Sequence, residues 1–201
     1  MHKTHFALNV MLKNNMILSN EGFEIGDFII PSFKLNEGEI IRLCLYGGSH
    51  FFPLVDELTK IFMGINPSPR VKLFQKIAFA EHIYPHGFKE YFYPLTIERY
   101  LKQNGQANFE DLKLFSGLDY ITANTKIATL PGNQRKWLSI VSKLSLTKNI
   151  IFDLVGQDPM GATTTLKVIK SLLDQGYSAI FLDNFDDLEM KFDREYYIKE
   201  K

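Results

Sequence analysis

Two short stretches of this sequence carry residues that could handle a phosphate and a divalent cation. In "NIIFDLV" (149–155), Asp153 follows three apolar residues, and carboxylate oxygens are ligands that Mg²⁺ accepts. In "LYGGSH" (45–50), Gly47 and Gly48 follow another apolar run, and adjacent glycines allow backbone N–H groups to approach an anion. Whether the chain holds a working site for a metal-bound phosphate depends on the elements around these residues.

The second half of the chain is predicted to alternate strands and helices. "NIIFDLV" and "YSAIFLDN" (177–184) are continuous apolar runs, typical of strands buried on both faces. Helical spacing of apolar residues marks "NQRKWLSIVSKLSL" (133–146), with Trp137 as core, and "ATTTLKVIKSLLDQG" (162–176). This order indicates an α/β protein with a mostly parallel sheet covered by helices.

The first half begins with a β-rich region and contains one clear helix. Four short segments, 5–12, 16–25, 27–35 and 38–47, are rich in β-branched and aromatic residues and predict a β region that leads into Gly47. Residues 52–65 have helical spacing and end at Gly64. Residues 70–83 predict another strand, and residues 96–116 are mostly helical, with an interruption at Gly105.

Composition narrows the class of protein. The 201 residues contain 23 Lys plus Arg and 23 Asp plus Glu, so no excess charge favours nucleic acid as a partner. Cys44 is the only cysteine, which permits no internal disulfide and predicts a small buried side chain in a reducing compartment. The N-terminus lacks the apolar core of a secretory signal, and no apolar run is long enough to span a bilayer. We therefore expect a cytoplasmic protein.

The order of these segments resembles the ATP-binding subunit of ABC transporters along nearly the whole chain. "NEGEIIRLCLYGG" is similar to the strand that enters the phosphate loop (Walker A), and "YPLTIERYLK" to the segment after the Q-loop. "LPGNQRKWLSIVSKL" is similar to the family's "LSGGQ" signature, "IIFDLVGQDPMG" to Walker B with the D-loop, and "SAIFLDNFDDLE" to the strand that ends at the switch histidine. The resemblance implies a P-loop NTPase fold of the ABC ATPase type, with a mostly parallel sheet and an N-terminal antiparallel β region. It also implies a core lobe (1–80 and 130–201) and a small inserted helical lobe (about 82–129).

The phosphate loop departs from the family pattern. A working loop needs a Lys for the β- and γ-phosphates and a Ser or Thr for Mg²⁺. Here Phe51, Phe52 and Pro53 are expected in the middle of the loop, where bulk and a missing N–H obstruct a phosphate. No Lys or Arg occurs between Gly47 and Lys60, which falls deep in the next helix, and the acidic pair Asp56–Glu57 would repel an anion.

The other motifs are altered as well. Leu154 stands where the family has a general-base Glu, and it cannot accept a proton. Pro131 and Asn133 replace a Ser and a Gly of the signature, whereas Leu130, Gly132 and Gln134 match it. Asn184 stands at the position of the switch His, and Glu81 or His82 lies nearest to the position of the Q-loop Gln. Asp158 lies nearest to the position of the D-loop Asp, although the loop from Asp153 to Asp158 is shorter than the family's.

The motif positions leave five candidate nucleotide contacts: Gly47, Gly48, Ser49, Gly132 and Gln134. They leave Asp153 as the candidate metal ligand and provide no catalytic residue. ATP and Mg²⁺ are therefore expected to bind weakly or not at all. The first hypothesis is a degenerate, non-hydrolysing subunit that works beside a membrane permease, an ATP-active paralogous subunit or a second copy of itself, peripheral to the inner face of the membrane. The alternatives are a divergent active ATPase that borrows its base or lysine, and a stand-alone scaffold or regulator that reuses the fold.

Two further groups have competing interpretations. His82 and His86 could form a metal pair only on a helix, which Pro85 and Gly87 disfavour, so we expect no metal site there. Aromatic residues in 84–93 could receive a helix of a membrane subunit or simply pack the small lobe; they are Tyr84, Phe88, Tyr91, Phe92 and Tyr93.

Overall fold

The computed structural model describes residues 15–84, 93–115, 120–184, 192 and 194–201, and its centre is a five-stranded parallel sheet. The strands follow the order β10-β5-β9-β8-β7, and each neighbouring pair is parallel. Their bounds are β5 Ile40–Cys44, β7 Ala78–Ala80, β8 Asn149–Phe152, β9 Ser178–Asp183 and β10 Glu195–Tyr197. The predicted α/β class is confirmed.

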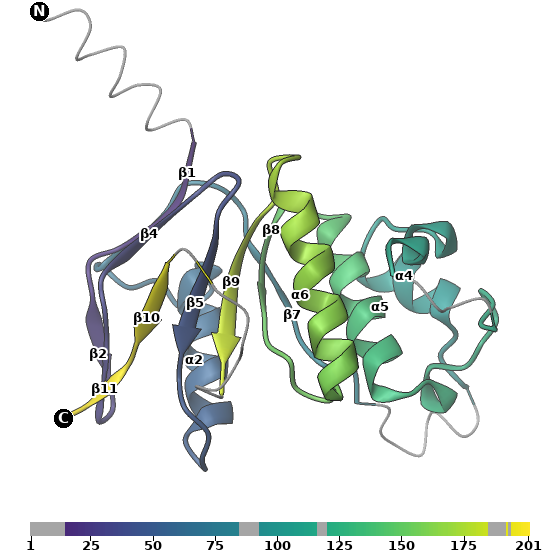
Figure 1. Ribbon diagram of the computed structural model, residues 1–201, viewed down its shortest axis with the longest axis horizontal. Helices are drawn as coiled ribbons and strands as arrows, with labels where there is room; N and C mark the ends of the chain where they lie inside the picture. The colour runs from purple at the N-terminus through teal and green to yellow at the C-terminus, as the bar shows by residue number, and fades with distance from the viewer. Residues whose placement is uncertain (1–14, 85–92, 116–119, 185–191, 193) are drawn as a thin grey trace, which may run out of the picture.

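Two antiparallel sheets of three strands each lie beside the parallel sheet (Figure 1). One has the order β4-β1-β6 and the other β11-β3-β2. Their bounds are β1 Met16–Asn20, β2 Phe23–Ile25, β3 Phe28–Ile30, β4 Phe33–Asn36, β6 Val71–Leu73 and β11 Lys199–Glu200. The expected antiparallel region is confirmed for 16–25 and 27–35, whereas 38–47 contains β5 of the parallel sheet. The segment 5–12 lies outside the described residues.

Residues 70–83 do not form the single strand that the sequence predicts. They form β6, which pairs with β1, and β7, which pairs with β8 in the parallel sheet. Between the two strands, the backbone N–H groups of Phe74 and Gln75 both donate to the carbonyl of Ile17. The chain turns there and leaves one sheet for the other.

The helices cover both faces of the parallel sheet, and alternate strand residues show which face each one covers. Ile151 and Ile180 pack with helix α2 (Phe51–Phe62) and the antiparallel strands. Their neighbours Ile150 and Phe181 pack with α5 (Gly132–Leu144), α6 (Pro159–Leu173) and α4 (Ile97–Asn104). Figure 1 shows α5 and α6 side by side, with α4 beyond them. Among the helices of the described residues, none is both long and apolar enough to cross a lipid bilayer.

The segment between β7 and α5 packs on α5 rather than joining the sheet. It contains α4 and two 3₁₀ helices, Phe109–Leu114 and Ile127–Thr129. Phe115 stacks on Trp137 of α5, with ring centroids 5.0 Å apart. Trp137 is therefore a core residue, as predicted, and the division into a core lobe and a helical lobe at about 82–129 stays a prediction.

Two polar features lie inside the parallel sheet. Cys44 is buried at the end of β5, as predicted, and this burial raises the pKa of its thiol to about 11.

Arg42 of the same strand is 3% exposed, and its Nε donates to Asp183 Oδ2 of β9 at 2.7 Å. A charged pair in this position joins the two central strands inside a medium of low dielectric, where neither charge is stable alone.

Replacing Arg42 with Met should lower the free energy of unfolding by about 3–5 kcal/mol, because Asp183 stays buried without the guanidinium. Urea denaturation followed by circular dichroism measures the change. Lys60→Met is the matched control, since Lys60 pairs with Asp56 on the exposed surface of α2, and its expected cost is below about 1 kcal/mol. Equal losses in the two variants would contradict this account of the sheet.

Candidate functional site

The residues singled out from the sequence gather at the carboxyl ends of the parallel strands. Ligands of open α/β sheets bind outside this edge. The turn with Gly47 and Gly48 follows β5, Asn184 follows β9, Asp153 follows β8, and Glu81 follows β7. Leu45 N–H donates to the Asp183 carbonyl at 2.7 Å, and Gly47 packs against the Asn184 carbonyl. β9 separates the Gly47–Gly48 turn from Asp153.

The turn after β5 is shorter than the sequence suggests. Phe51, Phe52 and Pro53 do not fill the middle of a loop, because they form the first turn of α2, where a proline is tolerated. The turn is closed by Phe51 N–H, which donates to the Gly48 carbonyl at 3.2 Å, and by His50 Nε2, which lies 3.0 Å from the Leu45 carbonyl. Only Tyr46, Gly47, Gly48 and Ser49 remain exposed in it. Gly47 and Gly48 are thus at the surface, but the turn contains too few residues to surround a phosphate.

The acidic and basic residues near this turn lie away from it. Lys60 belongs to the last turn of α2, as predicted, and its Nζ pairs with Asp56 Oδ2 at 2.6 Å. Lys60 lies nine positions after Phe51, which is about 14 Å along the helix axis. Lys60 therefore offers no charge to an anion bound at Gly47 and Gly48.

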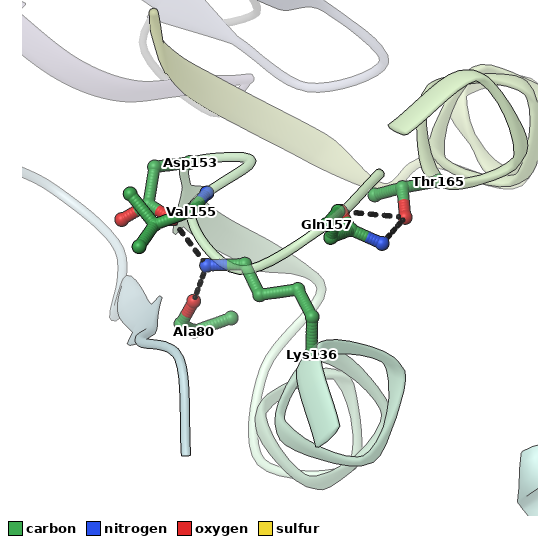
Figure 2. Close-up of polar contacts among 6 residues, drawn as sticks. All are labelled: Ala80, Lys136, Asp153, Val155, Gln157 and Thr165. Carbon is green, nitrogen blue, oxygen red and sulfur yellow. Dashed lines mark hydrogen bonds and ion pairs between the residues drawn. The ribbon is translucent and has the colours of Figure 1, made fainter. Parts of the chain in front are cut away.

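Asp153 contacts a lysine that the sequence analysis did not consider. Lys136 Nζ lies 2.6 Å from Asp153 Oδ1 and donates to the Ala80 carbonyl at 2.7 Å (Figure 2). The Val155 N–H also donates to Asp153 Oδ1, at 2.9 Å. Lys136 is 0% exposed and Asp153 is 4% exposed. Burial lowers the pKa of the Lys136 ammonium, and the Asp153 carboxylate opposes this change in part.

The sequence did contain a signal for Lys136. Lys136, Ile140 and Leu144 recur every four residues and so share one stripe of α5. A lysine on an apolar stripe needs a buried acceptor, and Asp153 at the end of a continuous apolar strand is the matching carboxylate.

The segment similar to the family's signature is packed against its own chain. Pro131 is the N-cap of α5, and Gly132 is its first residue. Asn133 Nδ2 donates to Asp158 Oδ2 at 2.9 Å, and Asn133 Oδ1 accepts the Asp158 backbone N–H at 3.1 Å. Gln134 donates to the hydroxyl of Tyr120 at 2.7 Å. Asn133 and Gln134 therefore satisfy polar groups of the same chain.

The turn after β8 fits closely between α5 and His82. A Cβ atom on Gly132 would overlap the Gly156 carbonyl oxygen, and a Cβ atom on Gly156 would overlap the His82 ring. Farther along the same turn, Gln157 exchanges hydrogen bonds with Thr165 of α6, at 2.9 and 3.1 Å (Figure 2). Trp137 Nε1 donates to the same Thr165 hydroxyl at 2.9 Å. The turn is fixed on both sides.

His82 lies at the end of β7 and is 7% exposed. Its Nδ1 has no hydrogen-bond partner, and burial, together with the positive charges of Lys136 and Arg135, lowers the pKa of His82 to about 4. His86 lies outside the described residues, as do Phe88, Tyr91 and Phe92. In the described part of the chain, no three His, Cys, Asp or Glu side chains gather where they could hold a metal ion.

A groove of about 610 Å³ opens beside the edge strand β7. Helix α2 contributes Phe52 and Met63 to it, and the segment from β7 onward contributes Phe79, Glu81 and Tyr84. Phe52 is 61% exposed and Tyr84 is 53% exposed, so large apolar side chains face solvent at this edge. Asp153 and His82 also border the groove, which places it next to the candidate site.

Solved structures share this architecture. The chain superposes on a metal-chelate type ABC transporter in an inward-facing conformation with a TM-score of 0.63 at 19% identity, covering 84% of this chain and 73% of that one. It superposes on CbiO1 from Clostridium perfringens, part of the CbiONQ transporter complex, with a TM-score of 0.64 at 17% identity, covering 92% and 85%. An ATP-binding protein of an ABC transporter from Pyrococcus furiosus gives 0.66 at 14% identity, covering 90% and 96%. The chain has the ATP-binding cassette fold.

The fold that the sequence resemblance implied is confirmed. No protein-family model and no curated protein matches this sequence. The assignments of Gly47, Gly48, Ser49, Gly132 and Gln134 to a nucleotide and of Asp153 to a metal stay predictions.

Substituting Ala for Gly132 should lower the free energy of unfolding by about 1–3 kcal/mol, because the methyl group forces α5 away from the Gly156 backbone. Urea denaturation measures the loss. The control is Gly47→Ala, whose Cβ atom would lie 3.3 Å from the Asn184 carbonyl oxygen and needs only a small shift. Its expected change is within about 0.5 kcal/mol, as for most surface substitutions. A larger loss for Gly47→Ala than for Gly132→Ala would contradict the packing described here.

The stability of the protein should fall as the pH decreases from about 6.5 to about 4. His82 has a lower pKa in the folded protein than the ordinary value of 6.5, so the unfolded chain takes up the proton first. The contribution of the neutral His82 to the free energy of unfolding is fully present above pH 6.5 and is lost as the pH approaches 4. Its size is of order 1–3 kcal/mol. Urea denaturation of wild type and of His82→Gln across this range measures the difference. An identical pH dependence in both proteins would exclude His82 as its source.

Proposed function

We propose that this protein is a degenerate ATP-binding subunit of an ABC-type transporter complex, which keeps the cassette fold but does not hydrolyse ATP. The observation that carries the proposal is the turn after β5. Only Ser49 and His50 separate Gly48 from the apolar first turn of α2, where Phe51 and Pro53 stand, and the basic residue of this helix, Lys60, lies in its last turn. A triphosphate carries several negative charges, and a site without a lysine leaves most of that charge uncompensated.

The opposite end of the site also lacks a catalytic group. Leu154, directly after Asp153, has no atom that could take a proton from water. Asn184 can form hydrogen bonds at the edge of β9 but cannot carry a charge. We therefore infer that binding of Mg-ATP is weak or absent.

Lys136 does not rescue the divergent-ATPase alternative, in which a lysine is borrowed from elsewhere. Lys136 is the lysine nearest to the metal position, but it is 0% exposed and its Nζ bonds to Asp153 and Ala80. A phosphate could reach that ammonium only if α5 left the sheet. Lys136 therefore cannot serve as the borrowed cation of an active site while it keeps these contacts.

The groove beside β7 supports a role inside a membrane complex. Its exposed Phe52, Ile65 and Tyr84 make an apolar surface at the edge of the parallel sheet, where an amphipathic helix of a membrane subunit could bind. The solved structures with the same fold include a part of a transporter complex. We infer a permease or an ATP-active paralogous subunit as the partner, and a position on the cytoplasmic side of the membrane.

Purified protein supplied with Mg-ATP should release phosphate no faster than buffer alone, and isothermal titration calorimetry should detect no tight binding. The reason is the missing cation and base described above. Asp153→Ala is the control for both measurements, and wild type and variant should give the same trace. Phosphate release that Asp153→Ala abolishes would refute the proposal and support a divergent ATPase.

A further inference from the structure

The buried contact between Lys136 and Asp153 gives an internal partner to the carboxylate that the resemblance places at a metal. We propose that the Lys136 ammonium is a built-in counter-ion that takes the place of a divalent metal at Asp153, so that Mg²⁺ and similar ions are excluded. This inference rests on the proposed function and deepens it, since it names what occupies the metal position of a non-hydrolysing cassette.

The geometry leaves little room for a metal at the carboxylate oxygen involved. Asp153 Oδ1 accepts from Lys136 Nζ at 2.6 Å and from Val155 N–H at 2.9 Å. A metal bound at this oxygen would have to displace at least one of these donors. At Oδ1, the contacts therefore fit an ammonium ion rather than a dication.

The lysine cannot move aside easily. Its side chain is 0% exposed, its Nζ also donates to the Ala80 carbonyl at 2.7 Å, and it lies 5.9 Å from the centre of the Phe79 ring. Moving the ammonium into water would require α5 to separate from the end of β7. If the ammonium stays, a divalent ion at Asp153 meets a positive charge inside a medium of low dielectric, where like charges repel strongly.

The pair also has a structural role that accounts for keeping both charges. Lys136 extends from α5 and contacts the last residue of β7 and the residue after β8, as Figure 2 shows. Asp153 in turn holds the start of the following turn through Val155. One ammonium thus joins a helix to the ends of two adjacent strands, which a freely exchanging metal ion would not do permanently.

Binding of Mn²⁺, followed by the loss of its electron paramagnetic resonance signal, tests the inference without nucleotide. Wild type should leave the signal at its level in buffer. Lys136→Gln keeps a polar side chain of similar reach without the charge, and it should bind Mn²⁺ on the order of tenfold more tightly than wild type. The Lys136→Gln/Asp153→Asn double variant has neither charge and should return to the buffer level.

Either of two results would overturn the inference: Mn²⁺ bound by wild type and lost in the double variant, or no gain for a folded Lys136→Gln. Circular dichroism checks that each variant folds. If Lys136→Gln alone does not fold, the comparison of wild type with the double variant decides, with equal signals as the supporting result. Because no nucleotide is present, Mn²⁺ bound at Asp153 would end this inference alone, whereas phosphate release would end the proposed function.

Discussion

The buried ion pair between Lys136 and Asp153 is the interaction on which the candidate site depends. Taking two charges out of water costs several kcal/mol for each ion, and only close contact with further hydrogen bonds offsets that cost. The Ala80 carbonyl and the Val155 N–H supply those bonds. The position of α5 on the sheet is therefore set by a polar contact with strict geometry, in addition to the apolar contacts that cover most of the interface.

The packing around Gly156 adds a second constraint on the same region. The His82 ring lies on one side of this glycine and the first residue of α5 on the other, so the turn has no space for a side chain at Gly132 or Gly156. By resemblance to the family, Gly132 and Gln134 of this region would contact a nucleotide. Here Asn133 and Asp158 bind each other, and the segment contributes to the packing of its own chain.

Sequence patterns predicted the α/β class and most elements, because continuous apolar strands and helical spacing reflect burial directly. They gave a wrong prediction where the same local pattern is compatible with two different structures. Residues 70–83 look like one strand but are divided between two sheets, and Phe51 to Pro53 look like a loop because Pro53 also suits the first turn of a helix. The contact of Lys136 with Asp153 joins residues 17 positions apart through two layers of structure, so spacing alone could not fix it.

The only thiol of the chain has a consequence for following its motions. Cys44 is the last residue of β5, three positions before Gly47, and the raised pKa of its thiol keeps it protonated at neutral pH. Alkylating reagents attack the thiolate, and they must also reach the sulfur. The rate at which the native protein is alkylated therefore reports how often the centre of the sheet opens to solvent, with no label introduced.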